Sequence, residues 1–248
     1  MYEKRKKLLI EIGVYELEDD ISVEYWNKIS RDKTLSEDFI REFQNSVNWA
    51  YISEFQILSN DFIREFVDKI DWFYLSRGQK LTEVFIKEFK LKVRWLAISK
   101  HQVLSENFIR EFQDIVNWRY IVKHQVLSES FIKEFQELSK WGFVLWGLIS
   151  ENQMLSEEFI REFQELVDWD SISGKQILSE EFLFEFKNKI DIDWYFLNPK
   201  PNYNFIKKNI SKSTINHQEL ERSTLTETQK KEIKTILDLK YLFKNKET

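Results

Sequence analysis

The sequence predicts an all-α fold, a solenoid of two-helix, 23-residue repeats with an N-terminal cap and a C-terminal helical tail. Three observations support this prediction. A Leu-Ser or Leu-Thr pair recurs at a fixed interval through most of the chain. The chain has 42% hydrophobic and 16% aromatic residues, so it can bury an extensive core. Only 5 Gly and 2 Pro occur, too few for the many tight turns of an all-β protein.

Each repeat begins at the Leu-Ser or Leu-Thr pair. The leucines of these pairs are Leu35, Leu58, Leu81, Leu104, Leu127, Leu155 and Leu178. Five of the six intervals are 23 residues and the sixth is 28. The pattern within a repeat is L-S-E-x-F-I-R-E-F-Q-x-x-V-x-W-x-x-I-S-x-x-Q-x. A fixed period of this kind indicates stacked supersecondary units.

The first helix of each repeat is expected to begin at the serine. Ser36 suits the N-cap position, and the acidic residues after it favour the first turn of a helix. At the helical period, Phe39, Ile40, Phe43 and Val47 fall on one face, so the pattern predicts a core-facing stripe that runs as far as Val47.

The second helix is predicted to be shorter, about seven residues long, and to begin after an Asn or Asp N-cap. The predicted pairs of cap and first residue are Asn48–Trp49, Asp71–Trp72, Asn117–Trp118, Asp168–Trp169 and Asp193–Trp194. Helices this short are unstable in isolation because nucleation is costly. The repeats are therefore expected to stabilise one another by burying Phe, Ile and Trp between them.

Three polar columns recur, and the glutamate and glutamine columns are interpreted as serving the stack. A basic column is expected to face solvent and comprises Arg41, Arg64, Lys87, Arg110, Lys133 and Arg161. A glutamate column is expected to accept a hydrogen bond from the next repeat and comprises Glu42, Glu65, Glu88, Glu111, Glu134, Glu162 and Glu185. A glutamine column is expected to hold turn backbone and comprises Gln56, Gln79, Gln102, Gln125, Gln153 and Gln176. A catalytic group, in contrast, is needed only once.

The domain organisation follows from where the pattern holds. Residues 1–34 are expected to form a degenerate N-terminal cap, with Trp26 and Ile29 in register. Residues 35–198 are expected to form the solenoid of seven repeats. The repeat from Leu127 contains a five-residue insertion, and Trp146 rather than Trp141 keeps the spacing.

Residues 199–248 are predicted to form a linker and a final helix near 225–243. Thr226 and Gln229 fit a capping box at the start of that helix. Its predicted apolar stripe consists of Ile233, Ile236, Leu237 and Tyr241. The helix either covers the last repeat or binds something else.

The run LSEDFIREFQNSVNW, followed by AYISEFQ and LSNDFIREF, resembles a short-repeat family seen in uncharacterised proteins of large DNA viruses and bacteriophages. The resemblance covers roughly residues 20–197. It implies a virus-encoded helical solenoid and brings no catalytic residues. The insertion at 142–146 and the tail depart from the family's pattern.

Composition and motifs predict no enzyme, cofactor or metal site. The chain has no Cys, and it contains no P-loop, G-x-G-x-x-G, H-E-x-x-H or G-x-S-x-G motif. His101 and His124 occupy equivalent positions in adjacent repeats, but no third ligand column accompanies them. Because no segment approaches the roughly 20 apolar residues of a membrane span, we expect a soluble cytoplasmic protein, in the host cytoplasm if virus-encoded.

The candidate site is the set of positions that vary between repeats while the packing positions stay the same. The candidate partner-binding residues are Tyr51, Phe55, Tyr74, Arg77, Lys100, His101, Arg119, Tyr120, Lys123 and His124. Aromatic residues and arginine are enriched at protein interfaces, and the leading hypothesis is a protein-binding scaffold. One alternative is binding of single-stranded RNA or of nucleotides, which the net charge of −5 disfavours. The others are self-assembly through the C-terminal helix or exposed repeat ends, and an ordinary solvated surface.

Overall fold

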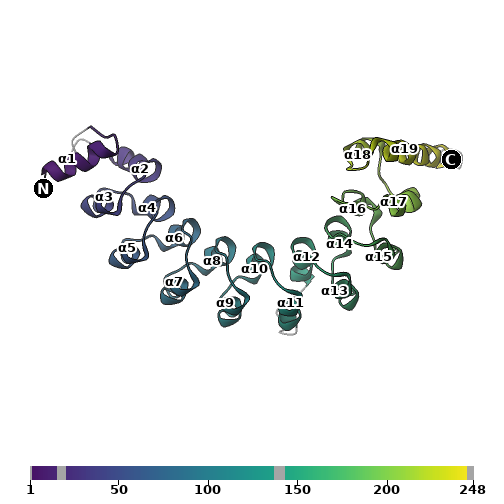
Figure 1. Ribbon diagram of the computed structural model, residues 1–248, viewed down its shortest axis with the longest axis horizontal. Coiled ribbons are helices and arrows are strands. Elements are labelled where there is room, and N and C mark those ends of the chain that lie inside the picture. The colour runs from purple at the N-terminus through teal and green to yellow at the C-terminus, as the bar shows by residue number, and fades with distance from the viewer. Residues whose placement is uncertain (1, 16–20, 137–142, 245–248) are drawn as a thin grey trace. The chain divides into compact units, whose positions relative to one another are not determined.

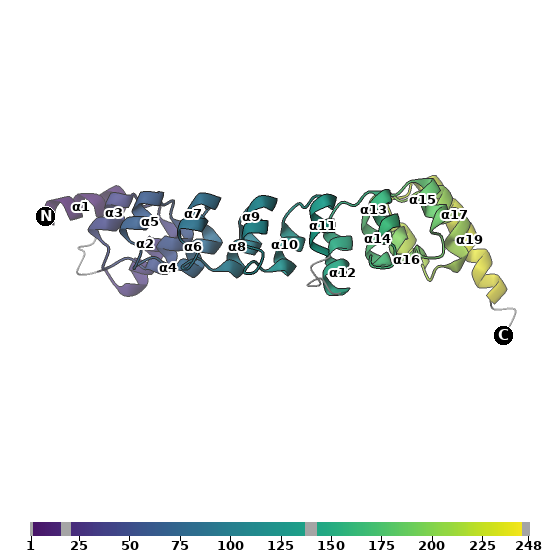
Figure 2. The ribbon, with the colours of Figure 1, turned by 90° about the horizontal axis from the view of Figure 1, so that it is seen from below.

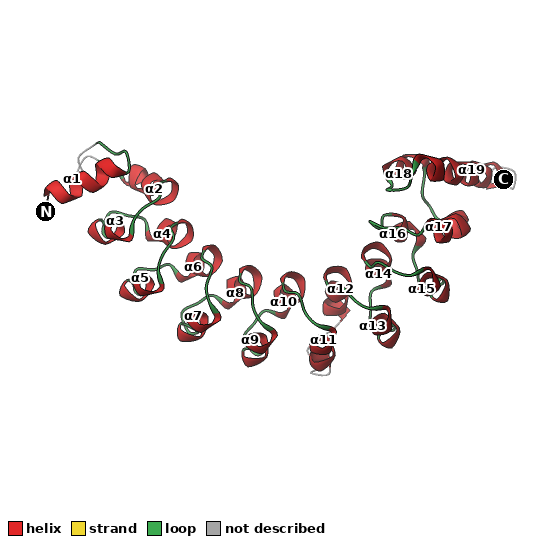
Figure 3. Ribbon diagram, viewed as in Figure 1, coloured by secondary structure: helices red, strands yellow, loops and turns green. Residues whose placement is uncertain are grey.

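The chain is a series of short helices packed side by side (Figure 1). The computed structural model describes residues 2–15, 21–136 and 143–244, and within these ranges all regular secondary structure is helical (Figure 3). The predicted all-α fold of solenoid-like repeats is therefore confirmed. The chain divides into two compact units, residues 1–125 and 126–248, called here the first and second units.

In the first unit each repeat contributes an A helix and then a B helix. The A helices are α3 (Glu37–Glu42), α5 (Asn60–Glu65), α7 (Glu83–Glu88) and α9 (Glu106–Glu111). The B helices are α4 (Trp49–Phe55), α6 (Trp72–Gly78), α8 (Trp95–His101) and α10 (Trp118–His124). The helices α1 (Tyr2–Glu11) and α2 (Val23–Asp32) precede them. Within this unit the B helices pack closely in an inner row, and the A helices form an outer row (Figure 1).

The second unit continues the alternation and then adds a helical tail. Its A helices are α11 (Glu129–Gln136), α13 (Glu157–Glu162) and α15 (Glu180–Glu185). Its B helices are α12 (Phe143–Asn152), α14 (Trp169–Lys175) and α16 (Ile192–Phe196). The tail comprises α17 (Tyr203–Asn209), the 3₁₀ turn η2 (Ile210–Lys212), α18 (His217–Arg222) and α19 (Glu227–Lys244). The long helix α19 packs beside η2 and α18 (Figures 1 and 2).

The predicted N-caps are present in the regular repeats. The Ser36 hydroxyl accepts a hydrogen bond from the Phe39 amide at 3.1 Å, and the Asn48 side chain accepts from the amides of Ala50 and Tyr51. These bonds satisfy amides that a helix start otherwise leaves without partners. One cap is absent from the pattern, because Arg94 makes no side-chain capping bond to α8.

The A helix ends earlier than predicted. It stops at Glu42, because Phe43 leaves helical geometry and the amides of Ser46 and Val47 both return to the Phe43 carbonyl at 2.9 and 3.0 Å. This tight turn still brings Val47 into the core, where it is buried. The predicted stripe was right about burial and wrong about the extent of the helix.

An aromatic core joins successive repeats. The Trp49 ring lies 6.3 Å from Phe62 and 5.1 Å from Phe66 of the next repeat, measured between centroids. Its indole N–H donates to the Gln44 carbonyl at 2.9 Å, so the polar edge of the ring is satisfied too. In the repeat with the insertion, Trp146 lies 5.3 Å from Phe163, which confirms the predicted spacing, while Trp141 lies outside the described residues.

The glutamine column has the predicted role. The Gln56 amide donates to the carbonyls of Ser30 and Lys33 at 2.9 and 2.8 Å, and its oxygen accepts from the Leu35 amide at 2.8 Å. Gln102 and Gln176 make the same three bonds in later repeats. Each such buried side chain therefore ties its own repeat to the turn of the preceding one.

The basic and glutamate columns bind each other, which corrects the expected partner of the glutamates. Arg64 donates to both carboxylate oxygens of Glu88 at 2.8 Å, and it also pairs with Asp61. The cation that binds each of these glutamates thus comes from the preceding repeat and not from the next one. The basic side chains also link repeats, in addition to facing solvent. Arg41 donates to one carboxylate oxygen of Glu65 at 2.8 Å, and its guanidinium lies 5.0 Å above the Phe62 ring.

The N-terminal segment adds a helix that the sequence pattern did not predict. Trp26 and Ile29 are buried in the predicted register. The helix α1 supplies the cations that the first A helix would otherwise lack: Lys4 binds Glu42 at 3.0 Å, and the Arg5 guanidinium lies 4.8 Å above the Phe43 ring.

The last B helix is shifted from its predicted position. Asp191, not Asp193, is the N-cap of α16, and Ile192 takes the place that tryptophan has in other repeats. The reason is that the cap must directly follow the buried aliphatic residue of the turn, here Ile190, as Asn48 follows its valine. Trp194 is consequently half exposed instead of packing in the core.

Residues 199–224, expected to be a linker, contain α17, η2 and α18. The final helix begins as predicted: the Thr226 amide donates to Gln229 at 3.0 Å, and the Gln229 amide donates back at 3.3 Å. Ile233 and Leu237 are fully buried, whereas the side chain of Tyr241 lies outside the described residues. The helix α19 therefore packs on the other tail elements, η2 and α18, at the end of the second unit.

Candidate partner-binding site

All ten candidate residues lie on the B helices α4, α6, α8 and α10 of the first unit. The three tyrosines are partly buried and the other seven side chains are exposed. The exposed side of these helices, which carries Arg77, Lys100, Arg119 and Lys123, is called here the basic face. The structure therefore places the predicted site on one side of one helix row.

Part of the basic face is hollowed into a groove of about 290 Å³ between α6, α8 and α10. It is lined by Phe73, Arg77, Leu96, Ala97, Lys100, His101 and Tyr120. Four candidate residues thus meet in one groove. Phe73, Leu96 and Ala97 complete it and were not among the predicted site residues.

The groove exists because one tyrosine is missing from a column. Tyr51, Tyr74 and Tyr120 occupy equivalent positions in their repeats, but α8 has Ala97 there. Alanine leaves the space that a ring fills in the other repeats of the first unit. Leu96 and Phe73, 53% and 45% exposed, supply apolar surface beside it. The sequence contains this signal, but only as a small residue in an aromatic column.

Every charged side chain that lines the groove is basic. The Lys100 ammonium lies 5.6 Å above the Tyr120 ring, and His124 stacks on that ring at 5.9 Å. Arg77 is paired with Glu54 at 3.3 Å, but it remains half exposed. The arrangement suits a ligand that combines negative charge with an apolar or aromatic group.

Partial burial, followed by the positive charge of this face, lowers the pKa of both histidines. Partial burial is the largest cause for His101, followed by the positive charges of Lys100 and Arg77 and by His124. For His124 the causes are partial burial and then Lys123 and Lys100. Both imidazoles are therefore neutral at neutral pH, and protonation would add charge to a surface that is already positive.

The remaining candidate residues lie outside the groove. Tyr51 and Phe55 pack against each other on α4 at 6.1 Å, and the Arg31 guanidinium lies 5.8 Å above the Tyr51 ring. Tyr74 meets Phe73 edge-on at 5.2 Å. Arg119 and Lys123 are exposed on α10 and extend the positive charge beyond the groove.

The equivalent side of the B helices in the second unit is mainly acidic, with three carboxylates and one lysine around a pocket. A pocket of about 360 Å³ lies between α12, α14 and α16. It is lined by Glu151, Asp168, Asp170, Ser171, Gly174, Lys175 and Trp194. Burial, followed by the neighbouring Asp168 and Asp191, raises the pKa of Asp170. This surface, with Glu151, Asp168, Asp170 and Trp194, is called here the acidic face.

Trp194 is the exposed aromatic residue of the acidic face. Its side chain is 49% exposed, and its ring lies beside Gly174, where an added Cβ would be 3.5 Å from it. Sequence reasoning missed this residue because it assigned Trp194 to the repeating core. The two-residue shift of α16 is what moves the ring to the surface.

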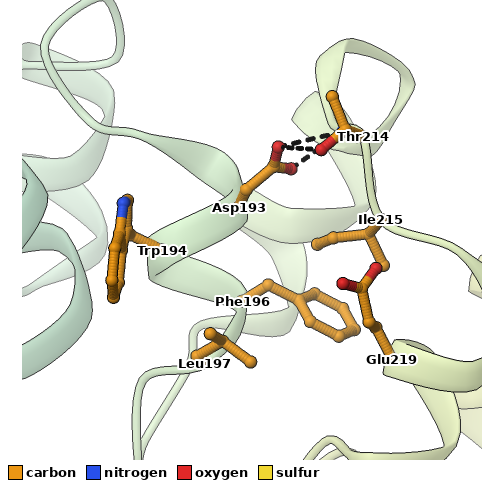
Figure 4. A pocket seen from close by; sticks show the side chains of 7 residues that line it. All are labelled: Asp193, Trp194, Phe196, Leu197, Thr214, Ile215 and Glu219. Carbon is orange, nitrogen blue, oxygen red and sulfur yellow. Dashed lines mark hydrogen bonds between the residues drawn. The ribbon is translucent and has the colours of Figure 1, made fainter.

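A smaller pocket, of about 140 Å³, lies where α16 meets the tail (Figure 4). Figure 4 shows the Phe196 ring facing Ile215 and Glu219, with Asp193 bonded to Thr214. Asp193 accepts from the Thr214 amide at 2.9 Å and from its hydroxyl at 2.6 Å. These bonds engage the Asp193 carboxylate and attach the tail to α16.

Among the residues that the structure describes, no group of three or more His, Cys, Asp or Glu side chains is placed to hold a metal ion. No helix in the described ranges is both long enough and apolar enough to span a membrane. Comparison of the chain with protein-family models, curated proteins and solved structures finds no match.

Proposed function

We propose that this chain is a non-catalytic binding scaffold that engages an acidic segment of another protein through its basic face. The observation that carries the proposal is the groove between α6, α8 and α10, in which basic side chains surround apolar and aromatic surface. Arginine and tyrosine are frequent hot-spot residues of protein interfaces, and both occur here.

The groove indicates the chemistry of the partner. Arg77 and Lys100 would donate hydrogen bonds to carboxylates of the partner, because both side chains are exposed and their charges are not buried inside the stack. The surface of Phe73 and Leu96 would accept an apolar side chain next to those carboxylates. We therefore propose a partner segment in which acidic residues flank a large apolar one.

Resemblance to the viral and phage repeat family supports a host protein as the partner, encountered in the host cytoplasm. The contact of Lys100 with Tyr120 would also suit a stacked nucleobase. The net charge of −5 counts against that alternative, since nucleic-acid binders gain most of their affinity from positive charge.

The test is affinity purification of the full chain from its native cells, followed by identification of the protein that co-elutes in stoichiometric amount. We expect the variant Arg77→Glu/Lys100→Glu/Arg119→Glu/Lys123→Glu, called here the basic-face variant, to lose that protein. The matched control reverses four exposed lysines outside the B helices of the first unit, Lys80, Lys90, Lys187 and Lys200, and should retain it.

Retention of the partner by the basic-face variant would contradict the proposed site. Recovery of single-stranded RNA instead of a protein, with binding that weakens steeply as salt is added, would favour the nucleic-acid alternative.

A further inference from the structure

We infer that the acidic face of the second unit docks on the basic face of a second copy of this chain. The inference rests on the proposed function, since it assumes that the basic face binds acidic protein surfaces. It adds the identity of one such surface, which the chain itself carries.

Charges are opposite at two pairs of matched repeat positions. Lys123 and Glu151 both lie five residues after their repeat's tryptophan, and Arg119 and Asp170 both lie one residue after it. At these positions the same side of the same kind of helix presents cations in the first unit and carboxylates in the second, where Lys175 is the one cation that lines the pocket. Two surfaces built on one repeat geometry can pair their charges in register.

The acidic face carries an exposed aromatic residue, and the basic face contains a groove. Trp194 is 49% exposed beside the carboxylates. The groove opened by Ala97 is bordered by Arg77 and Lys100, and cations of this kind bind indole rings favourably. An acidic surface with an adjacent large apolar group also has the properties proposed above for the partner of the groove.

A contact between two different surfaces of identical chains is heterologous, so it can link copies head to tail. Both surfaces are exposed in the structure of the single chain. A partner bound to the basic face would occupy the surface that a second copy needs. Partner binding and self-association are therefore mutually exclusive at that face.

The experiment measures the mass of the full chain by light scattering across a range of protein and salt concentrations. The acidic-face variant is Glu151→Lys/Asp170→Lys, which spares Asp168 because it caps α14. Its matched control, Glu158→Lys/Glu181→Lys, reverses two exposed glutamates on the A helices α13 and α15.

We expect the wild-type mass to rise with protein concentration and to fall toward that of one chain as salt screens the charges. The acidic-face and basic-face variants should each remain monomeric, and the control should associate like the wild type. Mixing the two variants in equal amounts should give a dimer, because each retains the face that the other needs.

A wild type that stays monomeric at low salt and at every concentration would overturn the inference. So would variants that each still associate, or two monomeric variants whose mixture does not. The acidic-face variant should keep the partner of the proposed function. Partner loss in the basic-face variant together with a monomeric wild type would therefore contradict the docking alone, whereas self-association without partner loss would contradict the proposed function.

Discussion

At the scale of single residues, the repeat is held by buried polar side chains whose partners are backbone groups of the neighbouring repeat. Ser76 is fully buried, donates to the Trp72 carbonyl at 2.6 Å and accepts from the Arg94 amide at 3.0 Å. Equivalent serines make the same pair of bonds in other repeats, as Ser99 does with Trp95 and Asn117. These side chains recur because removing one leaves a buried amide without an acceptor.

Ser76→Ala should lower the free energy of unfolding by about 1–3 kcal/mol, because the Arg94 amide then stays buried without its partner. Urea denaturation would measure the change. The control Ser211→Ala replaces an exposed serine of the tail and should change the free energy of unfolding by less than about 0.5 kcal/mol. Equal midpoints for the wild type and Ser76→Ala would show that the bond contributes nothing.

The histidines of the basic face make stability depend on pH. Burial and nearby cations lower the pKa of His101 below its ordinary value of 6.5, so the unfolded chain binds protons more readily than the folded one. The associated stability is complete above pH 6.5 and is lost as the pH falls through the depressed pKa. Urea midpoints should therefore fall on acidification, and His101→Gln should reduce that slope. An unchanged slope would contradict the argument.

At the scale of helices, the B helices approach each other more closely than the A helices do. Gly78 shows how close: a Cβ at this position would lie 2.4 Å from the Glu54 carbonyl oxygen of α4. The A helices are joined instead through long side chains such as Arg64 and Glu88. Half-exposed ion pairs of that kind contribute little individually, about 0–1 kcal/mol. Tight B-helix packing and the aromatic core thus dominate the cohesion of the repeats.

Gly78→Ala should destabilise the chain by about 1–3 kcal/mol, because the backbone of α4 must move to admit the methyl group. Gly147→Ala is the matched control. It lies in α12 with nothing within 4 Å of an added Cβ, so it should be stabilising by up to about 1 kcal/mol through helix propensity. Thermal melts of both variants measure this, and a shared sign would contradict the prediction.

At the scale of the whole molecule, stability is expected to be distributed over repeats that contact only their neighbours. The chain divides into units at 125/126, where the sequence pattern showed no boundary. Just before it, Val122 stands where several other repeats have the buried serine. The two units also differ in the charge of their B helices, basic around the groove and acidic around Trp194.

Destabilisation of one repeat should therefore remain local. In native-state hydrogen exchange, Gly78→Ala should accelerate exchange of amides in α4, α6 and α8 and leave α14 and α16 close to their wild-type rates. Mass spectrometry of peptides from both units would measure this. Uniform acceleration along the chain would show instead that it unfolds as a single cooperative unit.

Much of the architecture could be predicted because the same local signals occur in every repeat. Ser36 as a cap, Gln56 as a link to the preceding turn and Trp146 as the residue that keeps register were all predicted from spacing alone, and the structure confirms them. Where the pattern changes, prediction failed: Asp193 was taken for the last cap, and α1 was not predicted.

The helical class, the period and most of the core residues could be predicted from the amino-acid pattern, because apolar spacing and capping act within a few neighbouring residues. The ends of the A helices, the repeat that supplies the partner of each glutamate, and the hollow in the basic face follow only from the folded chain. These features depend on contacts between repeats. A missing ring at Ala97 opens a groove only because α6 and α10 stand on either side of it, and Trp194 is exposed only because Asp191 caps its helix.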